Sequence, residues 1–110
     1  MRALVALFAL VASVASAPPS DAAPMTGNDL HKYCAEDPAQ PEGTYAEGVC
    51  MGYMLAVIES STTPLCVPKG VKVKQSIDIV RKYLKEHPET RHQWARALVE
   101  DAVKSAFCKK

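Results

Sequence analysis

The chain has 110 residues, of which 48% are hydrophobic and 6% aromatic, a composition that suits one small globular domain and excludes two. Its 13 basic and 12 acidic side chains nearly balance, which argues against binding to nucleic acid or to an anionic membrane through overall charge. The five glycines and eight prolines follow no period, so collagen-like and low-complexity sequences are also excluded.

Residues 1–17 have the features of a secretory signal peptide. Arg2 provides a positive start, residues 3–14 form an apolar run, and residues 15–17 (Ala-Ser-Ala) match the small-x-small pattern that signal peptidase cleaves. The apolar run is shorter than the roughly 20 residues of a membrane span, and two prolines end it. We therefore expect cleavage after Ala17 and an exported mature chain without a membrane span.

The mature sequence divides into two halves of opposite charge. Residues 18–68 carry a net charge of −6, and residues 69–110 carry +6. We expect the two halves to pack against each other within one fold, and the alternative is a basic face kept for a partner.

The four cysteines are predicted to form disulfides, because an even number of cysteines in an exported chain is oxidised by default: Cys34, Cys50, Cys66 and Cys108. There is no CxxC pair and no histidine at a zinc-module spacing, so no metal site and no cofactor are predicted. None of the three histidines belongs to a nucleophile, metal-ligand or acid–base motif: His31, His87 and His92. No catalytic residue is predicted, and a binding protein is favoured over an enzyme.

The first predicted elements are short. Residues 18–26 are rich in Pro, Ala and Ser and indicate a flexible segment, so the folded domain is expected over residues 27–110. Asn28 is placed to cap a helix over residues 29–34, and turn-forming residues predict a loop over residues 35–44.

The second helix is predicted from Thr44, which forms a capping box with Glu47, to about Glu59. It is apolar on more than one side, through Val49, Tyr53 and Ile58 and also Met51, Met54, Leu55 and Val57. Such a helix is either central to its own bundle or covered by a second copy of the chain. Residues 60–70 form the next predicted loop.

The third helix has the clearest period, since apolar residues recur every three or four positions at Val73, Ile77, Val80 and Leu84. His87-Pro88 ends it, and Pro88 is suited to start a fourth helix whose buried residues are predicted to be Trp94, Leu98, Ala102 and Phe107. No alternating strand pattern occurs. The predicted fold is a small all-α, disulfide-stapled bundle of about four helices.

Three pairings of the four cysteines are possible, and the helix layout favours one of them. If successive helices are antiparallel, the end of the first helix lies near the early part of the second, which pairs Cys34 with Cys50. The end of the fourth helix then returns to the start of the third, which pairs Cys66 with Cys108.

A set of short motifs follows one order along the chain: Gly27-Asn28-Asp29-Leu30 before Cys34, Cys50-Met51-Gly52-Tyr53, Cys66-Val67-Pro68-Lys69-Gly70-Val71 with Gln75, Tyr83-Leu84-Lys85-Glu86-His87-Pro88-Glu89 with Arg91-His92, Ala97-Leu98-Val99, and Ala106-Phe107-Cys108. This set resembles the Rap/Tai family of amidase immunity proteins of type VI secretion. The resemblance implies a periplasmic, helical, disulfide-bonded and usually dimeric protein that blocks the active-site groove of a peptidoglycan amidase effector. The alternative is a generic exported envelope-binding module of the same fold without a toxin partner.

The sequence departs from the family pattern twice. Lys72 stands where the family usually has the Thr of a Thr-x-x-Gln capping box with Gln75, so we expect a different start of the third helix. Cys108 follows Phe107 directly, whereas the family often has a proline between them.

Two segments are candidates for insertion into the effector, the loop over residues 60–70 and the bend between the third and fourth helices. The bend is favoured because it offers charges of both signs on a short segment. Its candidate partner-binding residues are Lys85, Glu86, His87, Glu89 and Arg91.

Overall fold

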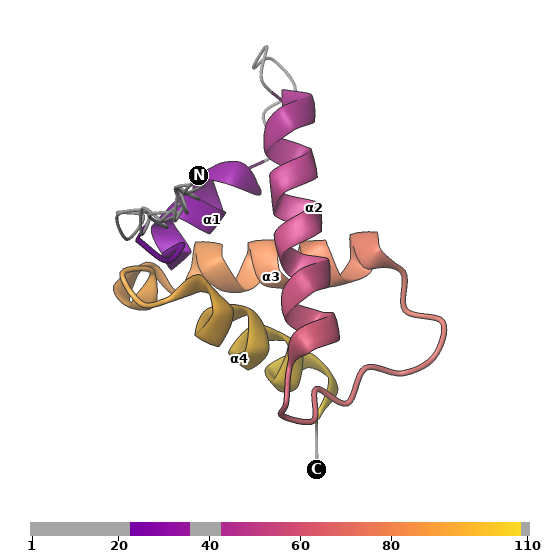
Figure 1. Cartoon of the computed structure of the whole chain (residues 1–110). Coiled ribbons are helices and arrows are strands. Elements are labelled where there is room, and N and C mark those ends of the chain that lie inside the picture. The colour runs from indigo at the N-terminus through magenta and orange to yellow at the C-terminus, as the bar shows by residue number, and fades with distance from the viewer. Residues whose placement is uncertain (1–22, 36–42, 109–110) are drawn as a thin grey trace, which may run out of the picture.

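The computed structural model describes residues 23–35 and 43–108, and these contain helices and no strand. The predicted all-α class is confirmed, while the predicted signal peptide over residues 1–17 lies outside the described residues. The elements are α1 (Gly27–Tyr33), α2 (Gly43–Ser60), α3 (Val73–Glu86), the 3-10 turn η1 (Pro88–Thr90) and α4 (Ala95–Phe107) (Figure 1). Within residues 23–35 and 43–108, no helix combines the length and the apolar character that a bilayer span requires.

The helices surround one core, and each of the four packs against the other three. In Figure 1, α2 crosses α3 rather than running alongside it, and α1 lies beside the end of α3 and the start of α4. The buried side chains include Leu30 from α1, Met54 and Val57 from α2, Ile77, Val80 and Leu84 from α3, and Leu98, Val99, Ala102 and Val103 from α4. Each large apolar side chain buried in this way contributes about 1.5–3 kcal/mol. The period predicted for α3 is confirmed from Ile77 to Leu84, whereas Val73 in its first turn is exposed.

Two disulfides fix the ends of the helices, with the predicted pairing. Cys34–Cys50 joins the end of α1 to α2, and Cys66–Cys108 joins the loop before α3 to the end of α4. Their Cα atoms are 5.1 and 5.2 Å apart. On the chain-entropy estimate each disulfide contributes about 3–4 kcal/mol, a large share of the stability of a domain of this size.

The cap of α1 is Thr26, and the prediction of Asn28 as the cap is wrong. The Thr26 hydroxyl accepts a hydrogen bond from the Asp29 amide at 3.3 Å, and the Asp29 carboxylate accepts one from the Thr26 amide at 3.0 Å. This reciprocal pair is a capping box, which satisfies two amides where Asn28 would have satisfied one. The helix therefore begins at Gly27, and Asn28 is its second residue.

The starts of α2 and α3 also differ from simple capping patterns. The structure places Thr44 inside α2, which begins at Gly43, so the prediction that Thr44 caps this helix is wrong. At α3, Lys72 occupies the cap position without a capping bond from its side chain, but the Gln75 side-chain oxygen accepts from the Lys72 amide at 2.8 Å. Half of the capping box persists in the absence of the usual threonine.

The prediction that the fourth helix starts at Pro88 is wrong. Pro88 starts the single turn η1, and α4 begins only at Ala95, with Trp94 as its cap residue. Trp94 is 54% exposed rather than buried in the helix stripe. The reason is that residues 91–95 use their backbone groups to bind the start of α1.

We call the backbone contact between residues 25–28 and residues 91–95 the clamp. The amides of Gly27 and Asn28 donate to the carbonyls of Gln93 and Arg91 at 2.9 and 2.7 Å, and the Ala95 amide donates to the Met25 carbonyl at 2.8 Å. Two of the amides that a helix start leaves without intrahelical partners are thereby satisfied. The prediction of a flexible segment over residues 18–26 falls mostly outside the described residues, but Met25 and Thr26 belong to the folded structure.

Gly27 allows the two segments of the clamp to approach this closely. A Cβ atom at this position would lie 2.8 Å from the Arg91 carbonyl oxygen and would overlap the Leu98 side chain. Gly27 is itself buried. The absence of a side chain is therefore a steric requirement of the clamp.

We expect Gly27→Ala to lower the free energy of unfolding by about 1–3 kcal/mol, because the added methyl group overpacks a site bounded by backbone. Gly48→Ala is the matched control, since a Cβ atom there meets nothing within 4 Å. In the interior of α2 this control is expected to stabilise the protein by about 0.5–1 kcal/mol. Chemical denaturation of the oxidised protein measures both changes. Equal stability of the two variants would show that the clamp does not need a glycine.

The two disulfides differ in their access to solvent. Cys34 and Cys50 are each 2% exposed, whereas Cys66 is exposed and Cys108 half-buried. Because thiol–disulfide exchange requires attack on a sulfur atom, a dithiol reductant is expected to open Cys66–Cys108 first under native conditions. Differential alkylation followed by mass spectrometry measures the order of release. Earlier labelling of Cys34 and Cys50 would contradict this expectation.

Candidate functional site

The bend between α3 and α4 presents most of its predicted partner-binding residues at the surface. Lys85 and Glu86 are exposed on the last turn of α3, and Glu89 is exposed on η1. His87, the C-cap of α3, and Arg91 are half-buried. Figure 1 shows this connection at the edge of the molecule beside α1. The three exposed side chains provide one positive and two negative charges on a short segment.

His87 gives the bend its shape. Its ring stacks on that of Tyr83 with centroids 4.1 Å apart, and its Nδ1 lies 2.8 Å from the Tyr83 carbonyl oxygen. The Thr90 hydroxyl in turn donates to the His87 carbonyl at 3.2 Å. Burial raises the pKa of the Tyr83 hydroxyl, and the negative charges of Asp101 and Glu89 raise it further, so the phenol stays neutral at pH 7. His87 therefore terminates α3 and fixes the course of the chain between the exposed charges on either side of it.

Arg91 is half-buried and belongs to the clamp. Its carbonyl binds the Asn28 amide, and its buried Nε has no acceptor among the described residues. It also faces α1, where burial lowers the pKa of His31 and the Arg91 charge lowers it further. His31 is therefore neutral at pH 7 and adds no positive charge beside the guanidinium. On the other side of the clamp, the capping hydrogen bonds from Thr26 hold the pKa of Asp29 below its usual value.

Trp94 is exposed, although helical periodicity predicts that it is buried. Its backbone is bridged to Thr26, and the Gln93 carbonyl and Ala95 amide on either side of it are both bound within the clamp. The indole nevertheless stays 54% exposed. The spacing from Trp94 to Leu98 fits a helical stripe, so periodicity alone predicts burial. A pairing between distant segments, which local patterns do not report, determines its exposure.

The competing loop over residues 60–70 lies at the other end of α3 from the bend (Figure 1). Its first part is fixed to α4, since the guanidinium of Arg96 donates to the Ser60 carbonyl at 3.1 Å and the Thr63 hydroxyl donates to Glu100 at 3.3 Å. Its middle is fixed by Cys66, which adopts a positive φ of 60°. The two predicted candidates for insertion are therefore separate surfaces.

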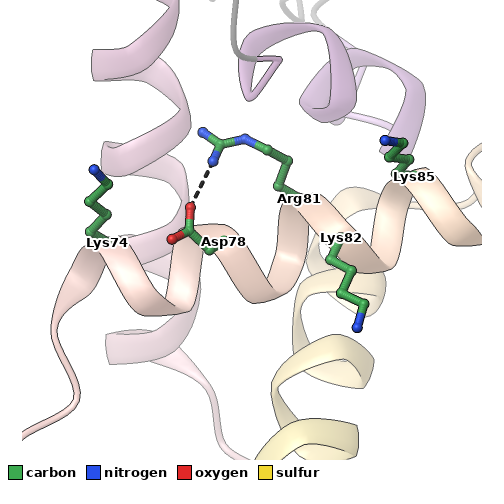
Figure 2. Close-up of a pocket in the computed structure, with 5 residues that line it drawn as sticks. All are labelled: Lys74, Asp78, Arg81, Lys82 and Lys85. Carbon is green, nitrogen blue, oxygen red and sulfur yellow. Dashed lines mark hydrogen bonds and ion pairs between the residues drawn. The ribbon is translucent and has the colours of Figure 1, made fainter.

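A row of charged side chains runs along α3, shown in Figure 2: Lys74, Asp78, Arg81, Lys82 and Lys85. The Asp78 carboxylate accepts from Arg81 at 2.8 Å, and Lys82 lies 3.9 Å from Glu86. Lys74, Arg81 and Lys85 extend on one side of the helix, whereas Lys82 extends on the other. The row surrounds a shallow, open hollow and carries a net positive charge that continues to the bend at Lys85.

Arginines of the basic half bind the acidic half mainly through backbone carbonyls. Arg81 Nε donates to the Cys34 carbonyl at 2.6 Å, and Arg96 donates to the Ser60 carbonyl. Both carbonyls lie at helix C-termini, where backbone acceptors lack intrahelical donors and the helix dipole favours a cation. Ion pairs between described residues lie within single helices. The two halves pack together as predicted, with arginine–carbonyl hydrogen bonds rather than ion pairs joining their described residues.

The described residues form a small, disulfide-bonded all-α domain. Its candidate binding features are the exposed charges of the bend, the exposed Trp94 and the charged row along α3. Among the described residues, no three His, Cys, Asp or Glu side chains are grouped so that they would hold a metal ion. A family model of Rap1a immunity proteins matches residues 26–108. The chain therefore belongs to the Rap1a immunity protein family, as its motifs predicted. The match begins at the Thr26 cap and ends at Cys108, so it includes the bend, both disulfides and every residue of the clamp except Met25. No curated protein and no solved structure shows significant similarity to the chain.

Proposed function

We propose that this protein is a periplasmic immunity protein that binds a peptidoglycan amidase effector of type VI secretion and occludes its active site. The family supports the role in immunity, and the resemblance stated above supplies the class of effector. The observation that carries the mechanism is the bend, which presents exposed charges of both signs on a segment fixed by His87 and the clamp. A segment that is already ordered loses little conformational entropy when it binds.

Inhibition of this kind requires no chemistry from the inhibitor. The exposed Lys85, Glu86 and Glu89 side chains supply electrostatic complementarity, which favours encounter and fixes register in the complex. His87 and Arg91 act by holding the bend in shape. The effector loses activity because substrate no longer reaches its catalytic residues.

The proposed function requires the protein and the amidase to be in the same compartment, the periplasm. The predicted signal peptide directs secretion, and the two disulfides are stable in an oxidising compartment. A peptidoglycan amidase acts in the same compartment. The alternative of an envelope-binding module without a toxin partner shares these features and differs only in what it binds.

We further propose that the protein is a homodimer through the exposed face of α2. Met54 and Val57 are buried in the protein's own core, which accounts for part of the excess of apolar residues in this helix. Tyr45 and Met51 remain 68% and 41% exposed.

Purified protein is expected to abolish the activity of its cognate peptidoglycan amidase effector at a one-to-one molar ratio and to cleave no peptidoglycan itself. The triple variant Lys85→Glu, Glu86→Lys, Glu89→Lys reverses the three exposed charges of the bend. It is expected to weaken inhibition at least tenfold, because it removes the electrostatic complementarity between the bend and the effector. The matched control is the double variant Thr62→Ala, Val67→Ser in the loop over residues 60–70. Inhibition that survives the bend variant and is lost in the control would assign insertion to the loop.

Light scattering at tens of micromolar protein is expected to give the mass of two chains. Met51→Lys is expected to give the mass of one chain, because it buries a charge without a partner in the α2 interface. Met51→Leu serves as the control and is expected to remain dimeric. A monomer mass for the unaltered protein would contradict the proposed dimer.

A further inference from the structure

We propose that Trp94 anchors the immunity protein in its effector, with the indole inserted into an apolar pocket at the edge of the active-site groove. This inference rests on the proposed function and adds a specific residue to it. The bend supplies charge, whereas Trp94 supplies the apolar contact that charge alone does not provide. Residues of this type contribute most of the binding energy in protein interfaces.

Trp94 is exposed although the rest of the apolar stripe of α4 is turned toward the core. Leu98 is 1% and Ala102 2% exposed, and Phe107 is half-buried and packs against the core. Trp94 begins the same helix and has the same spacing, yet it is 54% exposed. Its indole N–H forms no hydrogen bond with any described residue, so a binding pocket would provide an acceptor as well as apolar walls.

The clamp holds Trp94 in a defined position. The Thr26–Trp94 bridge and the hydrogen bonds on both sides of Trp94 fix its backbone, and the Leu98 amide donates to its carbonyl at 3.3 Å. An aromatic side chain on a fixed backbone has only two side-chain torsions left to order on binding. The exposed indole is thus preorganised for a partner.

The surface around Trp94 favours the effector over a second copy of this chain. Trp94 lies on the same connection as Glu89, and the two residues before it in the sequence, His92 and Gln93, are polar and exposed. An apolar centre with a polar rim is the usual composition of a protein–protein interface. The apolar face proposed for self-association is on α2 at Tyr45 and Met51, a separate element. The effector is therefore the occupant to which we assign this surface.

The chain contains one tryptophan, so a label at this residue type reports only on Trp94. Protein labelled with 5-fluorotryptophan is expected to give one fluorine resonance that shifts and broadens when the cognate peptidoglycan amidase effector is added. An unlabelled amidase adds no fluorine signal. An unchanged resonance in a complex that forms would overturn the assignment.

Inhibition assays with variants separate this inference from the proposed function. Trp94→Ala is expected to weaken binding of the amidase about 30-fold or more, and Trp94→Phe is expected to retain most of the affinity. Val73→Ala, which shortens another exposed apolar side chain in the first turn of α3, is the control and is expected to inhibit normally. Thermal unfolding shows whether Trp94→Ala remains folded. If this variant does not fold, the fluorine resonance of the labelled protein without substitutions still tests the contact of Trp94 with the amidase.

The inhibition and light-scattering results for Trp94→Ala distinguish the anchor from the proposed function. If the unaltered protein inhibits and Trp94→Ala inhibits equally well, the anchor is rejected and the proposed function stands. If Trp94→Ala inhibits normally but becomes monomeric, the surface belongs to self-association and the anchor is again rejected. If the unaltered protein neither binds nor inhibits the amidase, both proposals fail.

Discussion

The backbone hydrogen bonds of the clamp connect the beginning of the domain to the connection between its last two helices. They satisfy amides at the start of α1, delay the start of α4 to Ala95 and keep Trp94 at the surface. All three consequences depend on the close approach at Gly27, where any side chain would meet the Arg91 backbone. The glycine of the first family motif is thus explained by packing, and the surface that we propose for the effector is explained by the same contact.

Local sequence patterns predicted the parts of the fold that depend on neighbouring residues. The period of α3 identified buried Ile77, Val80 and Leu84, and the helix order was sufficient to pair the cysteines. The predictions failed where a distant segment competed with a local signal. Pro88 is a good first residue for a helix, but η1 uses that signal in a single turn because the residues after it bind α1.

The orientation of α2 shows a different limit of the sequence. Almost every side of this helix is apolar, so its pattern does not distinguish the residues that face its own core from those that face outward. The structure buries Met54 and leaves Met51 exposed, three positions apart. The exposure of Lys85, Glu86 and Glu89 was correctly predicted from polarity alone, whereas Arg91 is half-buried in the clamp. The support of these charges by His87 and the clamp required the three-dimensional arrangement.

We propose that the connection between α3 and α4 contacts the amidase effector. Hydrogen exchange of backbone amides, measured with and without a peptidoglycan amidase effector of type VI secretion, tests this contact because it reports on the whole chain without substitutions. Exchange is expected to be slower over residues 85–94 in the complex and unchanged over residues 61–72. Protection of residues 61–72 with none over residues 85–94 would contradict it.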